Sequence, residues 1–398
     1  MRLVCDWGHE PSDSALHRLC PECRAPLSFR YEAPIRLGTG RGMWRFAERL
    51  PEGPGKRVTL GEGDTPLVRT RLPLGCAVHW KVEARNPTGS QKDRALAVAI
   101  AAGLGRGATR VIMASTGSAG MSCAAYAARA GMRCAILCPG DTPTERLAAM
   151  WMNGAQVLRV DGSFEELMQI IAIARTELGY YETTTYRKAN PYQAEGPKTI
   201  AYEIVEELGA SPDAVLVPIG GGGTLAGIWR GFTELAGLGL AKRLPRMVGI
   251  QNVRFNALAL ALERGLHTDE EVADLKLDAS IPVLTKNLKH AVPPDTEDAL
   301  RALRESGGQV VTVTDEEALA AQRELARADG LFAEPSSSVG LVAARRLIEG
   351  GALAPDSVAV AVVTGSGLRE MDTVAQHHRP EIPRLAVGET LERLRAGT

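Results

Sequence analysis

The chain has 398 residues, 45% hydrophobic and 23% charged, which excludes an intrinsically disordered protein and predicts at least two folding units. Its 46 Lys and Arg residues balance 47 Asp and Glu residues, so we expect neither a nucleic-acid-binding surface nor an electrostatic membrane tether. No apolar run approaches the roughly 18 residues that a membrane-spanning helix needs, and the first residues lack the apolar core of a secretory signal.

The first 35 residues differ from the rest because they carry a cysteine and histidine cluster and few long apolar runs. A Gly/Pro-rich stretch over 50–67 separates them from the body of the chain. The cysteines number seven in all, and an odd number in a long chain argues against a disulfide framework. We therefore expect reduced thiols and a cytoplasmic location.

From about residue 92 onward, short apolar segments alternate with helical patterns. Their Val/Ile-rich runs show no polar alternation, which predicts strands buried on both faces of largely parallel sheets in an α/β protein. The stretch over 252–308 shows no clear pattern, and the last 20 or so residues read as a peripheral tail. The expected strands cover 111–115, 134–138, 156–160, 214–219, 247–251, 309–314 and 358–364, and the first three are followed by helices near 119–130, 143–153 and 163–178.

Lys92 is the first residue that suggests chemistry. Asn-Pro-Thr-Gly-Ser over 86–90 is typical of a turn, and it leads into Gln-Lys-Asp-Arg at the start of an Ala-rich helix. A lysine held there at the edge of a core is desolvated, which favours the neutral amine that imine chemistry requires. The alternative is a solvated lysine at a helix start.

A second candidate site lies where the strand over 111–115 delivers Ser115, Thr116, Gly117 and Ser118 into a helix. Hydroxyl and N–H groups at a helix N-terminus suit a substrate carboxylate. They equally suit ordinary N-capping, because Ser and Thr are good caps.

A third candidate site is the run of four glycines from Gly220 to Gly223, which lies between a buried strand and a helix opened by Thr224. Glycines let backbone N–H groups approach a phosphate, and the helix N-terminus adds free donors. A dinucleotide site would need an Asp or Glu at the end of the next strand, roughly 20 residues on. That strand ends in Gln251 instead, which favours a mononucleotide-like phosphate over a nicotinamide dehydrogenase.

A fourth candidate is Thr364, which ends the strand over 358–364 and precedes Gly-Ser-Gly. Its hydroxyl lies at the carboxyl end of a strand, where α/β sheets place their ligands. A similar loop, Glu-Pro-Ser-Ser-Ser over 334–338, also enters a helix.

Taken in order, these segments resemble the fold-type II pyridoxal phosphate enzymes, and within them the threonine-synthase group. The resemblance spans about residues 60 to 370. It is carried by GEGDTPL (61–67), NPTGSQKDR (86–94), STGSAGMS (115–122), NPYQAEGPKT (190–199), the Gly220–Thr224 loop, EPSSS (334–338) and TGSGLRE (364–370).

The resemblance implies two open, mostly parallel α/β domains with the cofactor in the cleft between them, plus a small N-terminal zinc-ribbon-like module. The module would cover 1–35, the large cofactor-binding domain 36–105 and 186–398, and the small mobile domain 106–185. The family is often homodimeric, so a homodimer is expected.

The resemblance also implies roles for the candidate residues. Lys92 would hold pyridoxal 5'-phosphate as an imine and move protons, and Thr364 would hydrogen-bond the pyridine nitrogen. The phosphate would be bound by Gly220, Gly221, Gly222, Gly223 and Thr224, the cofactor would also contact Ser118, and the substrate would contact Ser115, Thr116, Gly117 and Gln193.

Three departures from the family pattern bear on the substrate. Ser118 and Ala119 stand where the family usually has Asn-Thr, and Gln193 stands where threonine synthases tend to have an arginine. Arginine binds phosphate through two hydrogen bonds and a charge, whereas glutamine carries no charge. Arg94, Arg187 or Lys188 are the alternative sources of charge for a phosphorylated substrate.

The expected activity is that of a lyase or synthase that acts on a side-chain-activated amino acid by elimination and replacement. Threonine synthesis from O-phosphohomoserine is the first hypothesis. The alternative is β-elimination or β-replacement, as in serine or threonine dehydratases or in enzymes that make cysteate or cysteine from O-phosphoserine or another activated serine. A non-catalytic binding protein is a third possibility, against which the retention of Lys92 and Thr364 speaks.

The N-terminal cluster comprises Cys5, His9, Cys20 and Cys23, and the family often begins with a zinc ribbon of two Cys-x2-Cys knuckles. Here the second knuckle is intact and the first is reduced to Cys5-x3-His9. Three thiolates and an imidazole can form a tetrahedral zinc site. A ribbon that has lost its metal and packs without it is the equal alternative.

Overall fold

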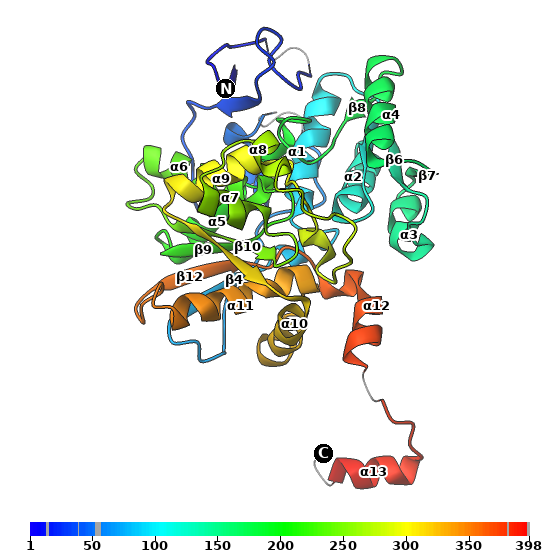
Figure 1. Cartoon of the computed structure of the whole chain (residues 1–398), viewed down its shortest axis with the longest axis vertical. Coiled ribbons are helices and arrows are strands. Elements are labelled where there is room, and N and C mark those ends of the chain that lie inside the picture. Colours follow the sequence, from blue (N-terminus) through cyan, green and yellow to red (C-terminus); the bar gives the residue numbers. More distant parts are fainter. Residues whose placement is uncertain (13–15, 39, 52–56, 380–381, 396–398) are drawn as a thin grey trace.

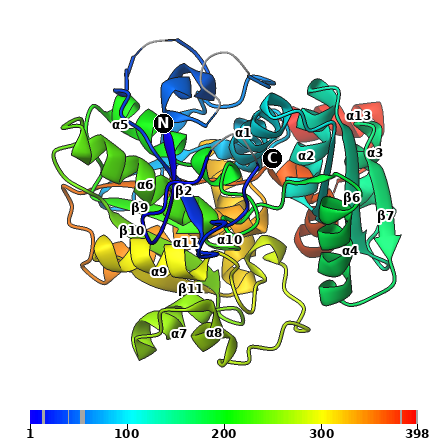
Figure 2. The same cartoon turned by 90° about the horizontal axis from the view of Figure 1, so that it is seen from above.

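The computed structural model describes residues 1–12, 16–38, 40–51, 57–379 and 382–395, and its strands form three sheets (Figures 1 and 2). Two of the sheets are mostly parallel and alternate with helices, which confirms the predicted α/β class. Within the described residues, no helix is long and apolar enough to cross a membrane.

The larger sheet has six strands in the order β11-β10-β9-β12-β4-β3. All neighbours pair in parallel except β3, which pairs with β4 in antiparallel fashion. The central strands are rich in valine and buried on both faces, as expected for a parallel sheet covered by helices. The strands are β3 (Leu67–Arg69), β4 (Ala77–Lys81), β9 (Ala214–Pro218), β10 (Arg246–Asn252), β11 (Gln309–Val313) and β12 (Val358–Val362).

Helices cover both faces of this sheet (Figure 2). Val215 and Val217 of β9 face one core, and Ala214 and Leu216 face the other, as the alternation of side chains along a strand requires. The first core is completed by α5 (Thr199–Leu208), α6 (Gly223–Gly237), α7 (Ala257–Arg264) and α9 (Thr296–Glu305), and α8 (Asp269–Ala273) lies beside it. The second core is completed by α10 (Asp315–Asp329) and α11 (Pro335–Glu349).

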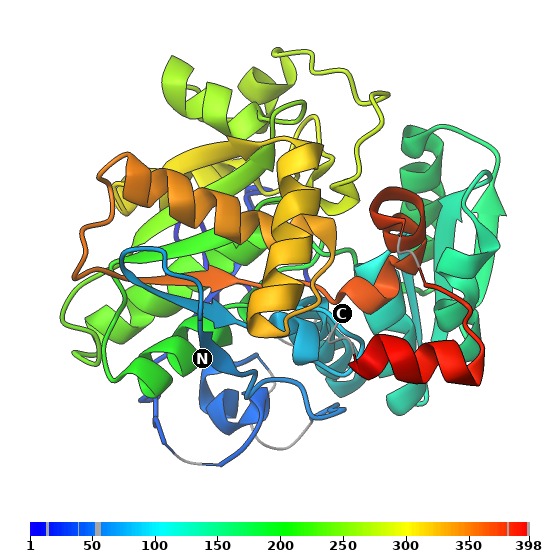
Figure 3. The same ribbon diagram turned by 90° about the horizontal axis from the view of Figure 1, so that it is seen from below.

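The smaller sheet is entirely parallel, in the order β7-β6-β5-β8. One face packs against α1, α2 and α3, and the other packs against α4. Figure 3 shows this group of elements beside the larger sheet. Its elements are α1 (Lys92–Gly105), β5 (Arg110–Ala114), α2 (Ser118–Arg129), β6 (Arg133–Pro139), α3 (Thr144–Met152), β7 (Gln156–Val160), α4 (Phe164–Thr176) and β8 (Tyr181–Glu182).

The N-terminal residues form an antiparallel hairpin of β1 (Arg2–Cys5) and β2 (Leu27–Arg30). Its apolar side chains pack with Ala102 of α1 and with Tyr192, so the module is attached to the body of the protein. At the other end, α12 (Met371–Thr373) leads to α13 (Val387–Arg395), which contains no buried residue and extends away from the body (Figure 1). The C-terminal segment is therefore peripheral, as predicted.

The sequence-based expectations differ from the structure in two respects. The strands over 156–160 and 309–314 were expected to be buried on both faces, but β7 is largely exposed and β11 is only partly buried, because each lies at the edge of its sheet. The strands β3, β4 and β8 were not predicted. β3 and β8 have only three and two residues, and β4 carries His79 and Lys81 among its apolar residues. The proposed domain boundaries stay predictions, although the strands of the smaller sheet all lie within residues 110–182.

Candidate functional site

A cavity of about 860 Å³ lies where strands of both mostly parallel sheets end. Residues that follow the carboxyl ends of β5, β9 and β12 line it, which is where open α/β sheets bind their ligands. We refer to this cavity as the cleft. It brings together three chain segments that lie far apart in the sequence, around residues 115–118, 220–224 and 364.

Lys92 begins α1 and lines the cleft. The turn before it is tied to the larger sheet, because Gln91 N–H donates to the carbonyl of Thr364 at 3.0 Å. The Lys92 ammonium donates to Thr185 Oγ1 at 3.1 Å. Loss of hydration lowers the pKa of Lys92 below its ordinary value, and the negative charge of Asp295 opposes this only in part. The lysine is therefore a partly desolvated amine in a ligand-sized cavity.

At two positions the glycine loop between β9 and α6 packs so closely on neighbouring backbone that a side chain is excluded. A Cβ on Gly220 would lie 2.2 Å from the carbonyl oxygen of Asn287, and one on Gly222 would lie 2.9 Å from that of Asp295. Gly222 also has a φ of 93°, a conformation that favours glycine. Gly220, Gly221, Gly222 and Thr224 line the cleft, whereas Gly223, the first residue of α6, does not.

The arrangement of the loop fits a phosphate group. The N-terminus of the 15-residue helix α6 directs free backbone N–H groups and the positive end of its dipole toward the cleft.

Thr364 follows β12 and lines the cleft beside the loop that precedes α11. Its Oγ1 lies 2.6 Å from Ser337 Oγ, which in turn accepts a hydrogen bond from the N–H of Gly365 at 2.8 Å. The Thr364 hydroxyl is therefore fixed in position by a neutral partner. A neutral hydroxyl can donate a hydrogen bond to an uncharged pyridine-type ring nitrogen.

The residues over 115–118 line the cleft, but they do not all point their polar groups into it. Ser115 Oγ accepts hydrogen bonds from the N–H groups of Gly120 at 2.9 Å and Gly117 at 3.3 Å. It thus serves the N-terminus of α2, in agreement with the capping interpretation. Thr116 and Ser118 line the cleft from the same turn.

Gln193 does not line the cleft with the other predicted residues. It is buried, with 4% of its surface exposed, in a short 3-10 helix (Gln193–Glu195), and its N–H donates to Asn190 Oδ1 at 3.2 Å. The family resemblance placed Gln193 near the substrate. In this structure the neighbouring Tyr192 packs with the N-terminal module.

The three cations considered as alternative sources of charge also lie outside the cleft lining, and each is held by carboxylates. Burial of a charge requires such partners, so these side chains stabilise the fold and are not free to bind a ligand. Arg94 pairs with Glu83 and Glu203 at 2.7 Å each, Arg187 pairs with Asp6 and Asp298, and Lys188 pairs with Asp269 at 2.6 Å and Glu297 at 3.1 Å.

Other cations line the cleft, and the sequence analysis missed them. Arg146 comes from α3 in the smaller-sheet group, and Lys286 and Lys289 come from the segment before α9. The acidic side chain among the described lining residues is Glu334, whose pKa is raised by burial. With Lys92 the cleft therefore has a positive balance of charge, which attracts anionic ligands.

The segment over 184–186 was also missed. Thr184, Thr185 and Tyr186 line the cleft directly after β8, and Thr185 is the hydrogen-bond partner of Lys92. The only sequence signal was a run of three threonines after a two-residue strand.

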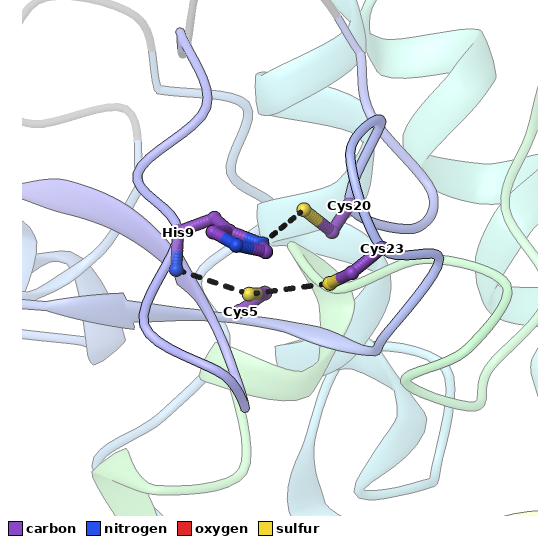
Figure 4. Close-up of side chains that lie close together, drawn as sticks. All are labelled: Cys5, His9, Cys20 and Cys23. Carbon is purple, nitrogen blue, oxygen red and sulfur yellow. Dashed lines mark hydrogen bonds between the residues drawn. The ribbon is translucent and has the colours of Figure 1, made fainter.

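A second group of side chains lies in the N-terminal module, where the ligand atoms of Cys5, His9, Cys20 and Cys23 lie within 4.8 Å of one another (Figure 4). The sulfurs of Cys5 and Cys23 are 3.7 Å apart, and Cys20 Sγ is 3.6 Å from His9 Nδ1. Thiolates bound to zinc at about 2.3 Å in a tetrahedron lie about 3.8 Å apart. The four residues fit a Cys3His set that could hold zinc.

The chain matches one family model, described as "Pyridoxal-phosphate dependent enzyme", over residues 58–365. It is 37% identical over 333 residues to a threonine synthase from Mycobacterium leprae, a match that covers 82% of this chain and 88% of that protein. It is 33% identical over 388 residues to a threonine synthase from Methanosarcina acetivorans, with 94% and 93% covered.

Solved structures share the fold at lower identity. Maize serine racemase has a TM-score of 0.65 at 19% identity, over 79% of this chain and 94% of that one. O-ureido-L-serine synthase has a TM-score of 0.65 at 21% identity, over 83% and 96%. The family match covers the lysine, glycine-loop and threonine segments of the cleft, and the curated relatives cover most of the chain. The chain therefore belongs to the pyridoxal-phosphate-dependent enzymes, within their threonine-synthase group.

Proposed function

We propose that the enzyme is a threonine synthase, which converts O-phosphohomoserine and water into threonine and inorganic phosphate. The observation that carries this proposal is the positive balance of the cleft, with Arg146, Lys286 and Lys289 lining it in addition to Lys92. A doubly charged phosphate on the substrate requires such partners, and an uncharged side chain such as that of serine does not. Relatives at 33–38% identity that are named threonine synthase support the same substrate.

The cofactor is assigned to the residues that the cleft brings together. Lys92 would hold it covalently, the N–H groups of the Gly220–Thr224 loop would bind its phosphate, and the Thr364 hydroxyl would donate a hydrogen bond to its ring nitrogen. Bound pyridoxal phosphate supplies an electron sink that makes the hydrogens on Cα and then Cβ of the attached amino acid acidic. Ser118 is assigned a contact with the cofactor ring from the start of α2.

Two charged groups orient the substrate, its carboxylate at one end and its phosphate at the other. The hydroxyls of Ser115 and Thr116, together with the N–H groups that follow Gly117 at the N-terminus of α2, bind its carboxylate. Arg146, Lys286 and Lys289 bind the phosphate that leaves from Cγ. Gln193 is not assigned a substrate contact, because it lies outside the lining of the cleft.

Proton transfer is assigned to Lys92, whose amine faces the cleft. Its lowered pKa leaves a larger neutral fraction at a given pH, so it can accept the protons that leave Cα and Cβ and return protons to Cγ and Cα. Thr185, which accepts a hydrogen bond from Lys92, holds the amine in position. Water then adds its oxygen to Cβ after the Cγ–O bond to phosphate has broken.

The Cys5, His9, Cys20 and Cys23 cluster is assigned a structural zinc ion, because its spacing matches a tetrahedral set and four protein ligands leave no open position for catalysis. None of the seven cysteines forms a disulfide, which is consistent with our proposal of a cytoplasmic enzyme. A homodimer remains our prediction for the assembly, to be measured by analytical ultracentrifugation.

The alternative function is β-elimination or β-replacement on serine, threonine or an O-activated serine. One observation favours it: Ser118 and Ala119 occupy the positions at which the family usually carries Asn-Thr.

A spectral titration distinguishes the two. Purified holoenzyme is titrated with O-phosphohomoserine, O-phosphoserine, serine and threonine while the visible absorbance of the cofactor is followed. Threonine synthase activity predicts the tightest response to O-phosphohomoserine, weakened about tenfold or more in Arg146→Gln by loss of a charged hydrogen bond. Arg133→Gln, at an exposed position outside the cleft lining, is the matched control and should leave the affinity unchanged. A response to serine or O-phosphoserine and none to O-phosphohomoserine would reject the proposal.

A further inference from the structure

His290 is an ionisable residue of the cleft lining that has no part in the assignments made so far. It follows a short 3-10 helix (Lys286–Leu288), and its side chain is exposed to the cleft. Its backbone N–H donates to the carbonyl of Leu288 at 3.1 Å, but its imidazole forms no hydrogen bond within the described residues. The ring is therefore open to a molecule that enters the cleft.

The imidazole lies beside both the cofactor loop and a cation assigned to the substrate phosphate. Its Cδ2 atom is 3.5 Å from the position of a Cβ on Gly220, so the ring packs against the first glycine of the loop. The residue before it, Lys289, lines the cleft and is assigned to the phosphate that leaves from Cγ. In the substrate, Cβ lies between Cα, which is next to the cofactor, and Cγ. His290 is therefore close to the part of the cleft in which Cβ reacts.

The surroundings of His290 keep its imidazole neutral. Loss of hydration and the positive charge of Lys92 lower the pKa of His290 to about 4. At neutral pH one ring nitrogen therefore carries a proton and the other has a free lone pair. A neutral imidazole of this kind can accept a proton from a molecule in the cleft, which an imidazolium cannot do.

The other ionisable side chains of the described lining, apart from Lys92, are poor candidates for an accessible base. Burial raises the pKa of Tyr186, so its hydroxyl keeps its proton at neutral pH. Glu334 is buried, with 3% of its surface exposed, and its Oε1 atom accepts hydrogen bonds from Asn287 Nδ2 at 2.8 Å and Ser337 Oγ at 3.2 Å. The remaining ones are cations without a free lone pair: Arg146, Lys286 and Lys289.

We propose that His290 is a second catalytic residue, which accepts a proton from the water molecule that adds to Cβ. This inference rests on the proposed threonine synthase reaction, in which the water oxygen bonds to Cβ and one O–H bond of the water breaks. Lys92 takes two protons from carbon and returns two, so the proton from water needs another acceptor. The phosphate that leaves carries one proton more than the phosphate of the ester. His290 passes the proton to this phosphate and becomes neutral again, which balances the reaction.

The test compares the products that native holoenzyme and His290→Asn form from O-phospho-L-homoserine. Inorganic phosphate, threonine and 2-oxobutanoate are measured in the same samples, and the absorbance of the cofactor is recorded. The ratio of threonine to 2-oxobutanoate should fall at least about a hundredfold, because general base catalysis contributes about 100-fold to 10,000-fold. Phosphate release in the first turnover should persist, because the Cγ–O bond breaks before water adds. The amino acid that gains no oxygen then hydrolyses to 2-oxobutanoate and ammonia.

Two further variants complete the test. His290→Ala should regain threonine formation when free imidazole is added, because the added base replaces the missing ring. His267→Asn, at an exposed position outside the cleft lining, is the matched control and should form the native products.

Three results would overturn the role of His290. The native product ratio in His290→Asn would show that the phosphate takes the proton from water directly. Loss of the cofactor absorbance in this variant would assign His290 to the binding of the cofactor. An equal fall in phosphate and threonine would assign it to the fold of the cleft. Failure of the proposed function is a separate result, because native enzyme would then form no threonine from this substrate, and the step assigned to His290 would be refuted with it.

Discussion

Replacement of Gly220 by alanine tests whether close backbone packing of the glycine loop creates the cofactor site. The added Cβ would lie 2.2 Å from the carbonyl oxygen of Asn287, whereas real Cβ atoms essentially never approach closer than 3.0 Å. The loop or the Asn287 segment must therefore move by about 0.8 Å or more, a displacement that misaligns N–H groups aimed at a phosphate. Overpacking of this kind costs about 1–3 kcal/mol, which corresponds to a cofactor dissociation constant about fivefold to 150-fold higher.

The assay is a titration of the apoenzyme with pyridoxal phosphate, followed by the visible absorbance of the bound cofactor, together with a melting curve. Two matched variants distinguish the effect of the contact with Asn287 from the general effect of replacing a glycine by alanine. In Gly221→Ala the Cβ would lie 3.2 Å from a ring carbon of Pro294, a contact that a shift of a few tenths of an ångström relieves, so we expect a change below about threefold. In Gly237→Ala, at the end of α6, nothing lies within 4 Å, and no loss of affinity is expected. Native affinity in Gly220→Ala would refute the assignment of this loop to the cofactor phosphate.

Three further predictions follow from single side chains. Lys92→Ala should abolish the visible absorbance of the covalently bound cofactor and lower turnover by at least about a thousandfold, while the melting temperature changes little; a variant that keeps the band would contradict the role of Lys92. Burial raises the pKa of Asp295 to about 7, above its unfolded value, so its contribution to stability is complete at low pH and is lost as the pH rises through 7. Asp295→Asn should therefore flatten the fall in melting temperature between about pH 5 and pH 8, and an unchanged slope would show that Asp295 does not titrate there. Cys20→Ala should remove one equivalent of zinc, measured by atomic emission, and lower the melting temperature, whereas Cys76→Ala, outside the cluster, should retain the metal; a metal-free native protein would contradict the zinc assignment.

The parts of the fold that sequence predicted well are those in which local pattern and tertiary role coincide. Runs such as 214–219 and 358–364 are buried on both faces because they lie in the middle of a parallel sheet, and there a run of valines is sufficient evidence. The strand over 156–160, Gln-Val-Leu-Arg-Val, is less apolar and lies at an edge, and its three apolar residues were not sufficient to distinguish an edge strand from a central one.

The residues of the candidate site also form two groups, those with a local sequence signal and those without one. Lys92, the Gly220–Gly223 run and Thr364 could be singled out because each requires a particular residue type at a strand or helix end. The cations that line the cleft could not be predicted from the sequence, because Arg146 and Lys289 reach the cleft from different parts of the chain and have no local signature. The same limit explains why Arg94, Arg187 and Lys188 were considered for the substrate phosphate: the carboxylates that neutralise them are distant in the sequence, as with Arg94 and Glu203.

The central claim is that the enzyme joins release of phosphate from Cγ to addition of water at Cβ. It is tested most directly by incubating purified holoenzyme with O-phospho-L-homoserine and measuring inorganic phosphate, threonine and 2-oxobutanoate in the same samples. The account predicts phosphate and threonine in equal amounts, with no 2-oxobutanoate. Phosphate accompanied by 2-oxobutanoate and ammonia in place of threonine, or no release of phosphate at all, would contradict it.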